Sequence, residues 1–264
     1  MTAHVRMPMN APVWTHSVGL LVLAELRQRY AGSVLGALWA VLAPLLEVAA
    51  YALVFGLLLG PAGSRDGLGF AFFVASGLLP WSSLREALEA SASALHDNRW
   101  IRRSRVPPAL LVSRAVLASA TRAAAGIVLV LGFAASRGLV SSPASLTLPV
   151  VALGLQLAVC HGLGLALAPL GVLYPDLRPA LGSGLTLLTF ASPILYPESV
   201  LPSWLRGWVE WNPFTHLLRL YRAPLGVPGT AGLDLAVVGL VSAVLLGVGH
   251  SLSQRLHWAA RDRL

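Results

Sequence analysis

Long apolar runs, separated by short polar segments, constrain this chain more than any other feature of its sequence. They cover residues 34–59, 68–95, 109–135, 149–173, 180–195 and 233–252, with boundaries good to a few residues. A helix crosses the hydrocarbon core of a bilayer with about 20 apolar residues, and most of the runs reach that length. Only 11% of the residues are charged, whereas a soluble domain has roughly a quarter. We therefore predict an all-α integral membrane protein, with residues 1–264 forming a single transmembrane domain of six transmembrane helices.

Two further segments are helical but do not fit a simple span. Residues 14–30 carry an apolar stripe and a polar far end, and they are too short to cross a bilayer. They predict an amphipathic helix in the membrane interface, with a cytosolic lead-in as the alternative. Residues 196–232 contain three tryptophans and five prolines, which predicts short re-entrant or interfacial helices on the outer side.

The distribution of arginine predicts the orientation of the chain. All of its positive charge comes from arginine, because the sequence contains no lysine, and the formal net charge is +8. With six spans, eleven arginines fall on the side of both termini and five on the other side. Cytoplasmic loops carry the excess of basic residues, so both termini are expected in the cytoplasm. These arginines also suit anionic lipid headgroups, and the chain has no nucleic-acid-binding motif.

The most basic segment joins the second and third spans, at residues 96–108. Four arginines lie within seven residues there, and Pro107-Pro108 stops any helix before the next span begins. One interpretation is an anchor that only fixes the topology. The other is a surface that receives a partner, which the tryptophan among the arginines favours because Trp and Arg are enriched at binding hot spots. The residues alone favour the two interpretations equally.

Ionisable side chains occur inside the predicted spans, where they usually face the protein interior or water and form pairs. At 1.5 Å per residue, Glu47 and Arg122 both fall near the middle of the bilayer. We predict that Arg122 pairs either with Glu47 or with Glu86 of the second span. The alternative is that each group contacts backbone carbonyls or water separately.

The sequence excludes several kinds of chemistry. A phosphate-binding loop needs a lysine that reaches the β- and γ-phosphates, so this chain cannot carry that type of ATPase site. Its one cysteine, Cys160, lies in an apolar run and excludes an internal disulfide. No catalytic, metal-binding or cofactor-binding constellation is present, and we therefore do not predict an enzyme.

Four stretches resemble a known family. They are Arg29–Trp39 continuing through Pro44 to Tyr51–Gly56; Gly77–Trp81 with Asn98 and the basic run to Pro108; Tyr174–Arg178 with Ser192–Pro197; and Asn212–His216 with Tyr221-Arg222. In this order they resemble the membrane subunit of ABC-2 type exporters, in particular the branch that exports bacterial polysaccharides such as O-antigen, capsule or teichoic acid. The resemblance covers most of residues 25–225.

The resemblance implies a homodimer in the bacterial inner membrane, bound to two copies of a separate ATPase subunit. ATP and magnesium would bind to that partner, and the substrate would be a lipid-linked glycan. The loop between spans 2 and 3 would dock into the ATPase through Asn98, Arg99, Trp100, Arg102, Arg103 and Arg105. Within the same family, the alternative is a permease for small hydrophobic molecules or lipids. From other classes, a membrane-embedded enzyme lacks its clustered ligands here, and a proton-coupled carrier would need more than one isolated charge pair.

Aromatic residues of the first span suggest a route for the substrate. Tyr51 and Phe55 lie in the span that leads the family resemblance, and aromatic faces can stack on the sugar rings of varied glycans. Ordinary helix packing is the alternative for either residue. We predict that both line the translocation path.

Overall fold

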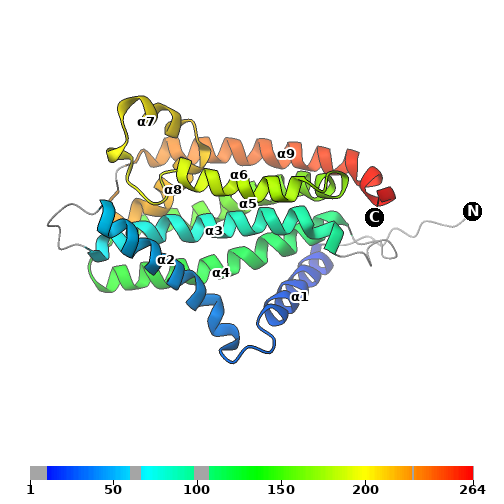
Figure 1. Ribbon diagram of the computed structural model, residues 1–264, viewed down its shortest axis with the longest axis horizontal. Coiled ribbons are helices and arrows are strands. Elements are labelled where there is room, and N and C mark those ends of the chain that lie inside the picture. Colours follow the sequence, from blue (N-terminus) through cyan, green and yellow to red (C-terminus); the bar gives the residue numbers. More distant parts are fainter. Residues whose placement is uncertain (1–10, 60–66, 98–106, 228, 264) are drawn as a thin grey trace, which may run out of the picture.

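The computed structural model describes residues 11–59, 67–97, 107–227 and 229–263. These residues form helices and contain no strand. Most of the long helices run side by side along one axis, and the first two long helices lie at an angle to it (Figure 1). The elements are α1 (Ala11–Arg29), η1 (Gly36–Leu38), α2 (Trp39–Leu59), α3 (Gly67–Asp97), α4 (Pro108–Ser136), η3 (Pro143–Leu146), α5 (Thr147–Leu173), α6 (Leu177–Ala191), η4 (Glu198–Val200), α7 (Ser203–Glu210), α8 (Pro213–Arg222), η5 (Ala223–Leu225) and α9 (Ala231–Arg263).

All six apolar runs become helices, but the number of membrane spans is not established. Among the described residues, three helices are both long and apolar enough to cross a bilayer: Pro108–Ser136, Pro143–Leu173 and Ala231–Leu256. Helix α3 has the length but carries four charged residues in its second half. Helix α6 has 15 residues, which gives about 22 Å against a hydrocarbon core of about 30 Å. It ends at Ala191, four residues before the predicted end, because the backbone at Ser192 is extended.

Helix α1 packs against α4, and this packing explains its apolar stripe. Val18, in the middle of the stripe, is buried, and Glu25 forms a 3.1 Å ion pair with Arg114 of α4. The opposite face exposes Leu20 and Leu23. Apolar residues therefore lie on both faces of α1, and the amphipathic interfacial helix predicted from the sequence is not established.

The core lies where α3 packs against α4 and α5, and α5 packs against α9. Glycines allow the closest of these approaches. A methyl group added to Gly249 of α9 would lie 1.9 Å from the carbonyl oxygen of Gly162 on α5, and one added to Gly171 would lie 2.0 Å from the carbonyl oxygen of Ala92 on α3. Small residues let membrane helices pack backbone against backbone, so these positions fix the spacing of three helices.

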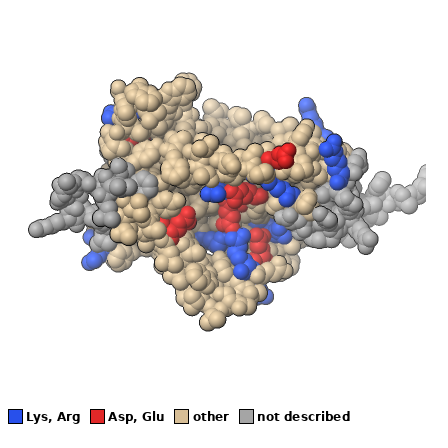
Figure 2. Space-filling model, viewed as in Figure 1, with Lys and Arg blue, Asp and Glu red and all other residues tan. Residues whose placement is uncertain are grey.

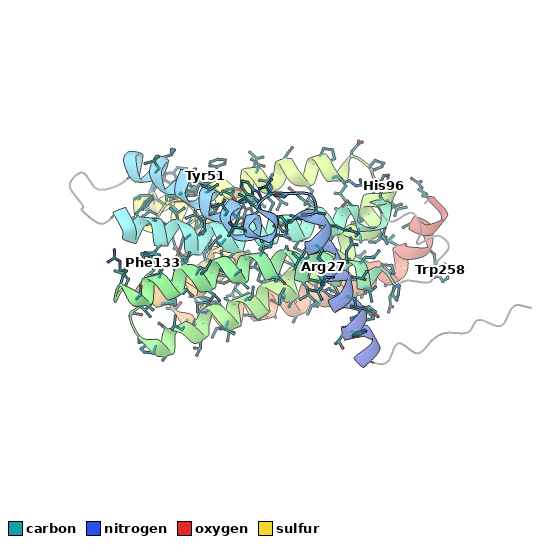
Figure 3. The ribbon with its side chains drawn as sticks, turned by 90° about the horizontal axis from the view of Figure 1, so that it is seen from below. Arg27, Tyr51, His96, Phe133 and Trp258 are labelled. Atoms are coloured by element: carbon teal, nitrogen blue, oxygen red, sulfur yellow. The ribbon has the colours of Figure 1, made fainter. Side chains whose placement is uncertain are left out.

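The bundle has two distinct ends. At one end, which we call the α8 end, the loop before α5 meets the end of α8 through a 2.8 Å hydrogen bond from Ser141 N to Pro224 O. At the other end, which we call the α3–α4 end, Arg263 of α9 donates to the carbonyl oxygen of Leu173 at the end of α5. Figure 3 marks the two ends by Phe133 on one side and by His96 and Trp258 on the other.

Candidate functional site

A polar cavity opens on the face formed by α2, α3 and α4. Its volume is about 210 Å³, and its walls include Arg29, Glu47, Glu86 and Arg122 with the hydroxyl groups of three serines. Figure 2 shows acidic and basic side chains gathered in the middle of this face, surrounded by uncharged surface. Charged groups at the depth of the spans avoid lipid, so this face is built to meet water or protein.

Glu86 is the centre of the charged group, which we call the Glu86 cluster and define as Arg29, Glu86 and Arg122. One carboxylate oxygen of Glu86 binds Arg29 from the end of α1, and the other binds Arg122 of α4. The Arg122 side chain is 11% exposed, and its Nη1 is buried without a hydrogen-bond partner among the described residues. Two guanidinium groups thus share one carboxylate, and one buried donor remains available.

Of the two pairings that the sequence allowed for Arg122, the structure contains the one with Glu86. Glu86 lies on α3, which packs along α4 and so faces Arg122 directly. Glu47 lies on α2, is exposed, and lines the same cavity without forming an ion pair within the described part of the chain. A further pair, from Arg85 Nε to Glu89 Oε1 at 3.0 Å, continues the polar surface along α3 with both side chains about 40% exposed (42% and 41%).

The predicted docking residues Asn98, Arg99, Trp100, Arg102, Arg103 and Arg105 lie outside the described residues. The structure does show how the segment returns to the bundle. Pro107 is extended, with φ −64° and ψ 137°, and α4 begins at Pro108. Proline suits the first helical position because that residue has no intrahelical partner for its N–H. The paired prolines therefore start α4 at a fixed point.

The two residues predicted to line the translocation path, Tyr51 and Phe55, both lie on α2. Tyr51 is half-buried and packs against the core, toward the end of the bundle that Phe133 marks (Figure 3). The side chain of Phe55 lies outside the described residues. A role for either residue in the translocation path stays a prediction.

A second polar group, which sequence reasoning missed, is buried at the α8 end. Arg222 is 2% exposed, and its guanidinium donates to the carbonyl oxygens of Pro193 and Ile194 at 2.6 and 2.7 Å. It also stacks 3.7 Å from the centre of the Phe73 ring. A methyl group at Gly77 would lie 2.7 Å from Arg222 Nη2, so this glycine makes room for the charge.

Further buried hydrogen bonds join α8 to α3, α5 and α6. Tyr221 donates to Gln156 Oε1 at 2.9 Å, and Gln156 Nε2 donates to the carbonyl oxygen of Pro80 at the same distance. Trp81 donates from Nε1 to Thr189 Oγ1 at 2.7 Å. We call this set the α8 network and define it as Arg222, Tyr221, Gln156, Trp81 and their hydrogen-bond partners.

The α8 network brings together three of the four stretches that carry the sequence resemblance. Gly77–Trp81, Ser192–Pro197 and Tyr221-Arg222 meet there, and Asn212 adds a fourth contact by donating to Ser192 Oγ at 2.8 Å. Asn212 also caps α8, because its side chain accepts from Phe214 N. One signal could have pointed to the network: Gln156 is an amide within an otherwise apolar run.

Comparison with known proteins agrees with this geometry. The family model of the ABC-2 type transporter matches residues 16–225, a range that includes the Glu86 cluster, the basic segment and the α8 network. The chain belongs to this family. The match ends before α9 begins, and it covers every stretch that the sequence resemblance used.

Several curated ABC-2 relatives are similar over most of their length. The O-antigen export system permease protein RfbA of Myxococcus xanthus is 32% identical over 207 residues, which are 77% of each chain. The polysialic acid transport protein KpsM of Escherichia coli is 26% identical over 89% of this chain and 92% of its own. An O-antigen export permease RfbA of Klebsiella pneumoniae is 23% identical over 89% of each chain. Transport of a polysaccharide is thus the activity that these relatives' names share.

Proposed function

We propose that this chain is the permease subunit of an ATP-binding-cassette exporter that moves a lipid-linked polysaccharide outward across the inner membrane. The observation that carries the proposal is the extent of the similarity to proteins named for O-antigen export and polysialic acid transport, which covers 77–89% of this chain. The chain works as a homodimer with two ATPase subunits. It carries no ATPase site of the phosphate-binding-loop type, because it has no lysine for such a loop, and ATP hydrolysis takes place on the partner subunit.

The polar face of α2, α3 and α4 is the proposed wall of the route. The Arg85–Glu89 pair is about 40% exposed (42% and 41%) on a helix as long as a membrane span, and charges in such a position are costly against lipid. A water-filled path at the seam between two copies removes that cost. The glycan would pass the Glu86 cluster and then Tyr51 and Phe55 on its way to the α8 end.

The basic segment at residues 96–108 is the proposed docking site for the ATPase. Its position in the chain, at the turn between α3 and α4, connects it directly to the two helices that hold the Glu86 cluster. Movement imposed on this turn therefore reaches the proposed route without an intermediate element. The same assignment puts both termini and the α3–α4 end in the cytoplasm, as the arginine distribution predicts.

The experiment is reconstitution of export in a bacterium that lacks its own O-antigen permease and ATPase. The chain is expressed with the ATPase that co-purifies with it, and surface polysaccharide is measured by gel and by antibody binding. Export that requires both proteins supports the proposal. Export of small hydrophobic dyes without any surface polysaccharide would instead support the lipid or drug permease of the same family.

Docking is tested in the same strain. Replacing Trp100 by Ala, or Arg102 and Arg103 by Ser, is expected to abolish co-purification of the ATPase and surface polysaccharide while the permease dimer persists in size-exclusion chromatography. The matched control replaces Arg255 and Arg261 of α9 by Ser, which removes the same charge near the same end of the bundle. Unchanged ATPase binding in the first two variants would contradict the docking assignment.

A further inference from the structure

A larger cavity lies at the α8 end, away from the Glu86 cluster. Its volume is about 1050 Å³, and its walls come from the segment before α7, from the turn between α7 and α8, from α8 and from the beginning of α9. The lining includes Phe73, Glu198, Glu210, Trp211, His216 and Arg219. Small-molecule sites typically enclose about 300–1,000 Å³, so this cavity can hold a ligand of several rings.

One wall of the cavity is a fixed ion pair. Arg219 of α8 donates from Nε to Glu198 Oε1 at 2.9 Å and from Nη2 to the second carboxylate oxygen, in a two-pronged geometry. Its Nη1 also lies 3.6 Å from Asp234 Oδ1 at the beginning of α9. The hydrogen bonds to Glu198 raise the pKa of Arg219 above its ordinary value, so the guanidinium keeps its charge and its orientation.

His216 fixes the adjacent wall. Its Nδ1 lies 2.7 Å from Asp234 Oδ1, and its Nε2 lies 2.9 Å from the backbone carbonyl oxygen of Glu210. Together with the Arg219 pair, these contacts join η4, α7, α8 and α9. Polar groups held by several elements are already in position before a ligand arrives, which lowers the entropy that binding must overcome.

Other groups on the lining keep free hydrogen-bonding capacity or free surface. Arg222 is 2% exposed, and its Nε is buried without a hydrogen-bond partner among the described residues. Buried polar groups in proteins nearly always have a partner, so this donor indicates a missing one. Glu210 is exposed, and the side chain of Trp211 is 88% exposed at the edge of the cavity.

The chemistry of the lining selects a class of ligand. Its two carboxylates, Glu198 and Glu210, face two guanidinium groups, Arg219 and Arg222, so the walls offer no large excess of either sign. A strongly anionic or cationic ligand would therefore gain little. Interleaved donors and acceptors beside an exposed indole suit a molecule whose hydroxyl groups both donate and accept, and whose C–H face can lie on an aromatic ring.

We propose that this cavity binds a short segment of a neutral saccharide chain. Trp211 stacks on a sugar ring, and Glu210 and Arg222 form hydrogen bonds with hydroxyl groups. The site is separate from the route along α2, α3 and α4. Its natural occupant, a part of the exported glycan that has reached the α8 end, rests on the proposed function.

The test uses the complex of permease and ATPase in lipid nanodiscs and three neutral probes: mannotriose, chitotriose and maltotriose. Saturation-transfer difference NMR measures the dissociation constant of each. We expect saturable binding of at least one probe, weakened at least tenfold by Trp211→Leu and several-fold by Glu210→Gln. The matched control is Trp208→Leu, because Trp208 is similarly exposed, at 75%, in the last turn of α7, which Trp211 directly follows, but does not line the cavity.

Two results would overturn the proposal. One is the absence of saturable binding for all three probes; the other is equal weakening by Trp211→Leu and Trp208→Leu. Displacement of the trisaccharide by glycerophosphoethanolamine at lower concentration than by a second trisaccharide would identify a lipid headgroup site instead. Surface polysaccharide measured in the same variants keeps the two proposals apart. Export without trisaccharide binding refutes only the cavity assignment, and binding without any export refutes only the proposed function.

Discussion

The Glu86 cluster and the α8 network both place arginines inside a helical bundle, but they stabilise them in different ways. Arg222 in the α8 network is 2% exposed and contacts neutral groups: it donates to two carbonyl oxygens and stacks on an aromatic ring. In the cluster, Arg29 and Glu86 are 42% and 30% exposed and are bound as ions. A charge satisfied by neutral backbone groups ties three segments rigidly together. A partly exposed ion pair can exchange its partners for water or substrate, which is what a transport route requires.

The strongest test of this difference removes the buried arginine. Arg222→Leu leaves the carbonyl oxygens of Pro193 and Ile194 without their donor, so we expect the free energy of unfolding to fall by about 3 kcal/mol or more. Arg206 also donates to two backbone carbonyls but is exposed, and Arg206→Leu should cost only about 0.5 kcal/mol. Thermal unfolding in detergent measures both changes in the free energy of unfolding. Equal losses in the two variants would show that Arg222 is no more important for stability than the exposed Arg206.

The glycines near the two regions provide the next test. Gly77→Ala places a methyl group 2.7 Å from Arg222 Nη2 and 3.0 Å from the Ile194 carbonyl oxygen, which should cost about 1–3 kcal/mol. At Gly182, beside the polar face, the nearest atom is Glu89 Oε1 at 3.7 Å. Gly182→Ala should therefore be neutral or stabilise α6 by up to about 1 kcal/mol. The expected result is a lower free energy of unfolding for Gly77→Ala and no loss for Gly182→Ala, both measured by thermal unfolding in detergent.

A charge exchange tests the direct pairing in the cluster. Glu86→Gln should lower stability by only about 1 kcal/mol, because solvent screens this partly exposed site, yet it should reduce export strongly by leaving two arginines unbalanced. Glu86→Arg combined with Arg122→Glu restores one acid and two bases to the cluster, with the acid now on α4. We expect this double variant to regain part of the export lost in each single variant, measured as surface polysaccharide.

If the double variant brings no more polysaccharide to the surface than the better of the two single variants does, Arg122 and Glu86 act independently. The corresponding exchange of Glu47 with Arg122 serves as the control. It should give no recovery, because the structure contains no pair between them.

The smallest expected effect is at Tyr51. Tyr51→Leu keeps an apolar side chain of similar reach on α2, so the unfolding temperature should change little. Loss of the aromatic face should slow export of long glycans by a few-fold, measured from the rate at which labelled polysaccharide reaches the surface. Tyr51→Phe is the control and should export at the parental rate. Equal rates for the Leu and Phe variants would assign Tyr51 to packing.

The sequence predicted the positions of the helices better than it predicted the side-chain contacts between them. Apolar runs and prolines placed the ends of α3, α4 and α5 within about two residues, because both signals are local. Glu86, in the polar half of α3, was one of the two partners suggested for Arg122. Sequence alone could not choose between Glu47 and Glu86, since that choice depends on which helix lies beside α4.

The α8 network was out of reach for the same physical reason. Its hydrogen bonds join residues far apart in the chain, such as Trp81 with Thr189 and Tyr221 with Gln156. Hydropathy describes residues 213–222 as a mixed polar segment, typical of a surface helix. Tertiary packing overrides this description and buries eight of the ten residues of α8. The apolar stripe of α1 is a related case, because the structure packs part of it against α4, and a position of this helix in the membrane interface stays a prediction.

The contact between Gly162 and Gly249 has a consequence for how the chain can move. With no side chain between α5 and α9 at that point, neither helix can slide or turn against the other without a clash of main-chain atoms. We expect α5 and α9 to move as one rigid body through the whole transport cycle. Any widening of the bundle must then be taken up on the opposite flank, where α2 borders the polar cavity. A cross-link between α5 and α9 should therefore leave export intact, whereas one between α2 and α3 should arrest it.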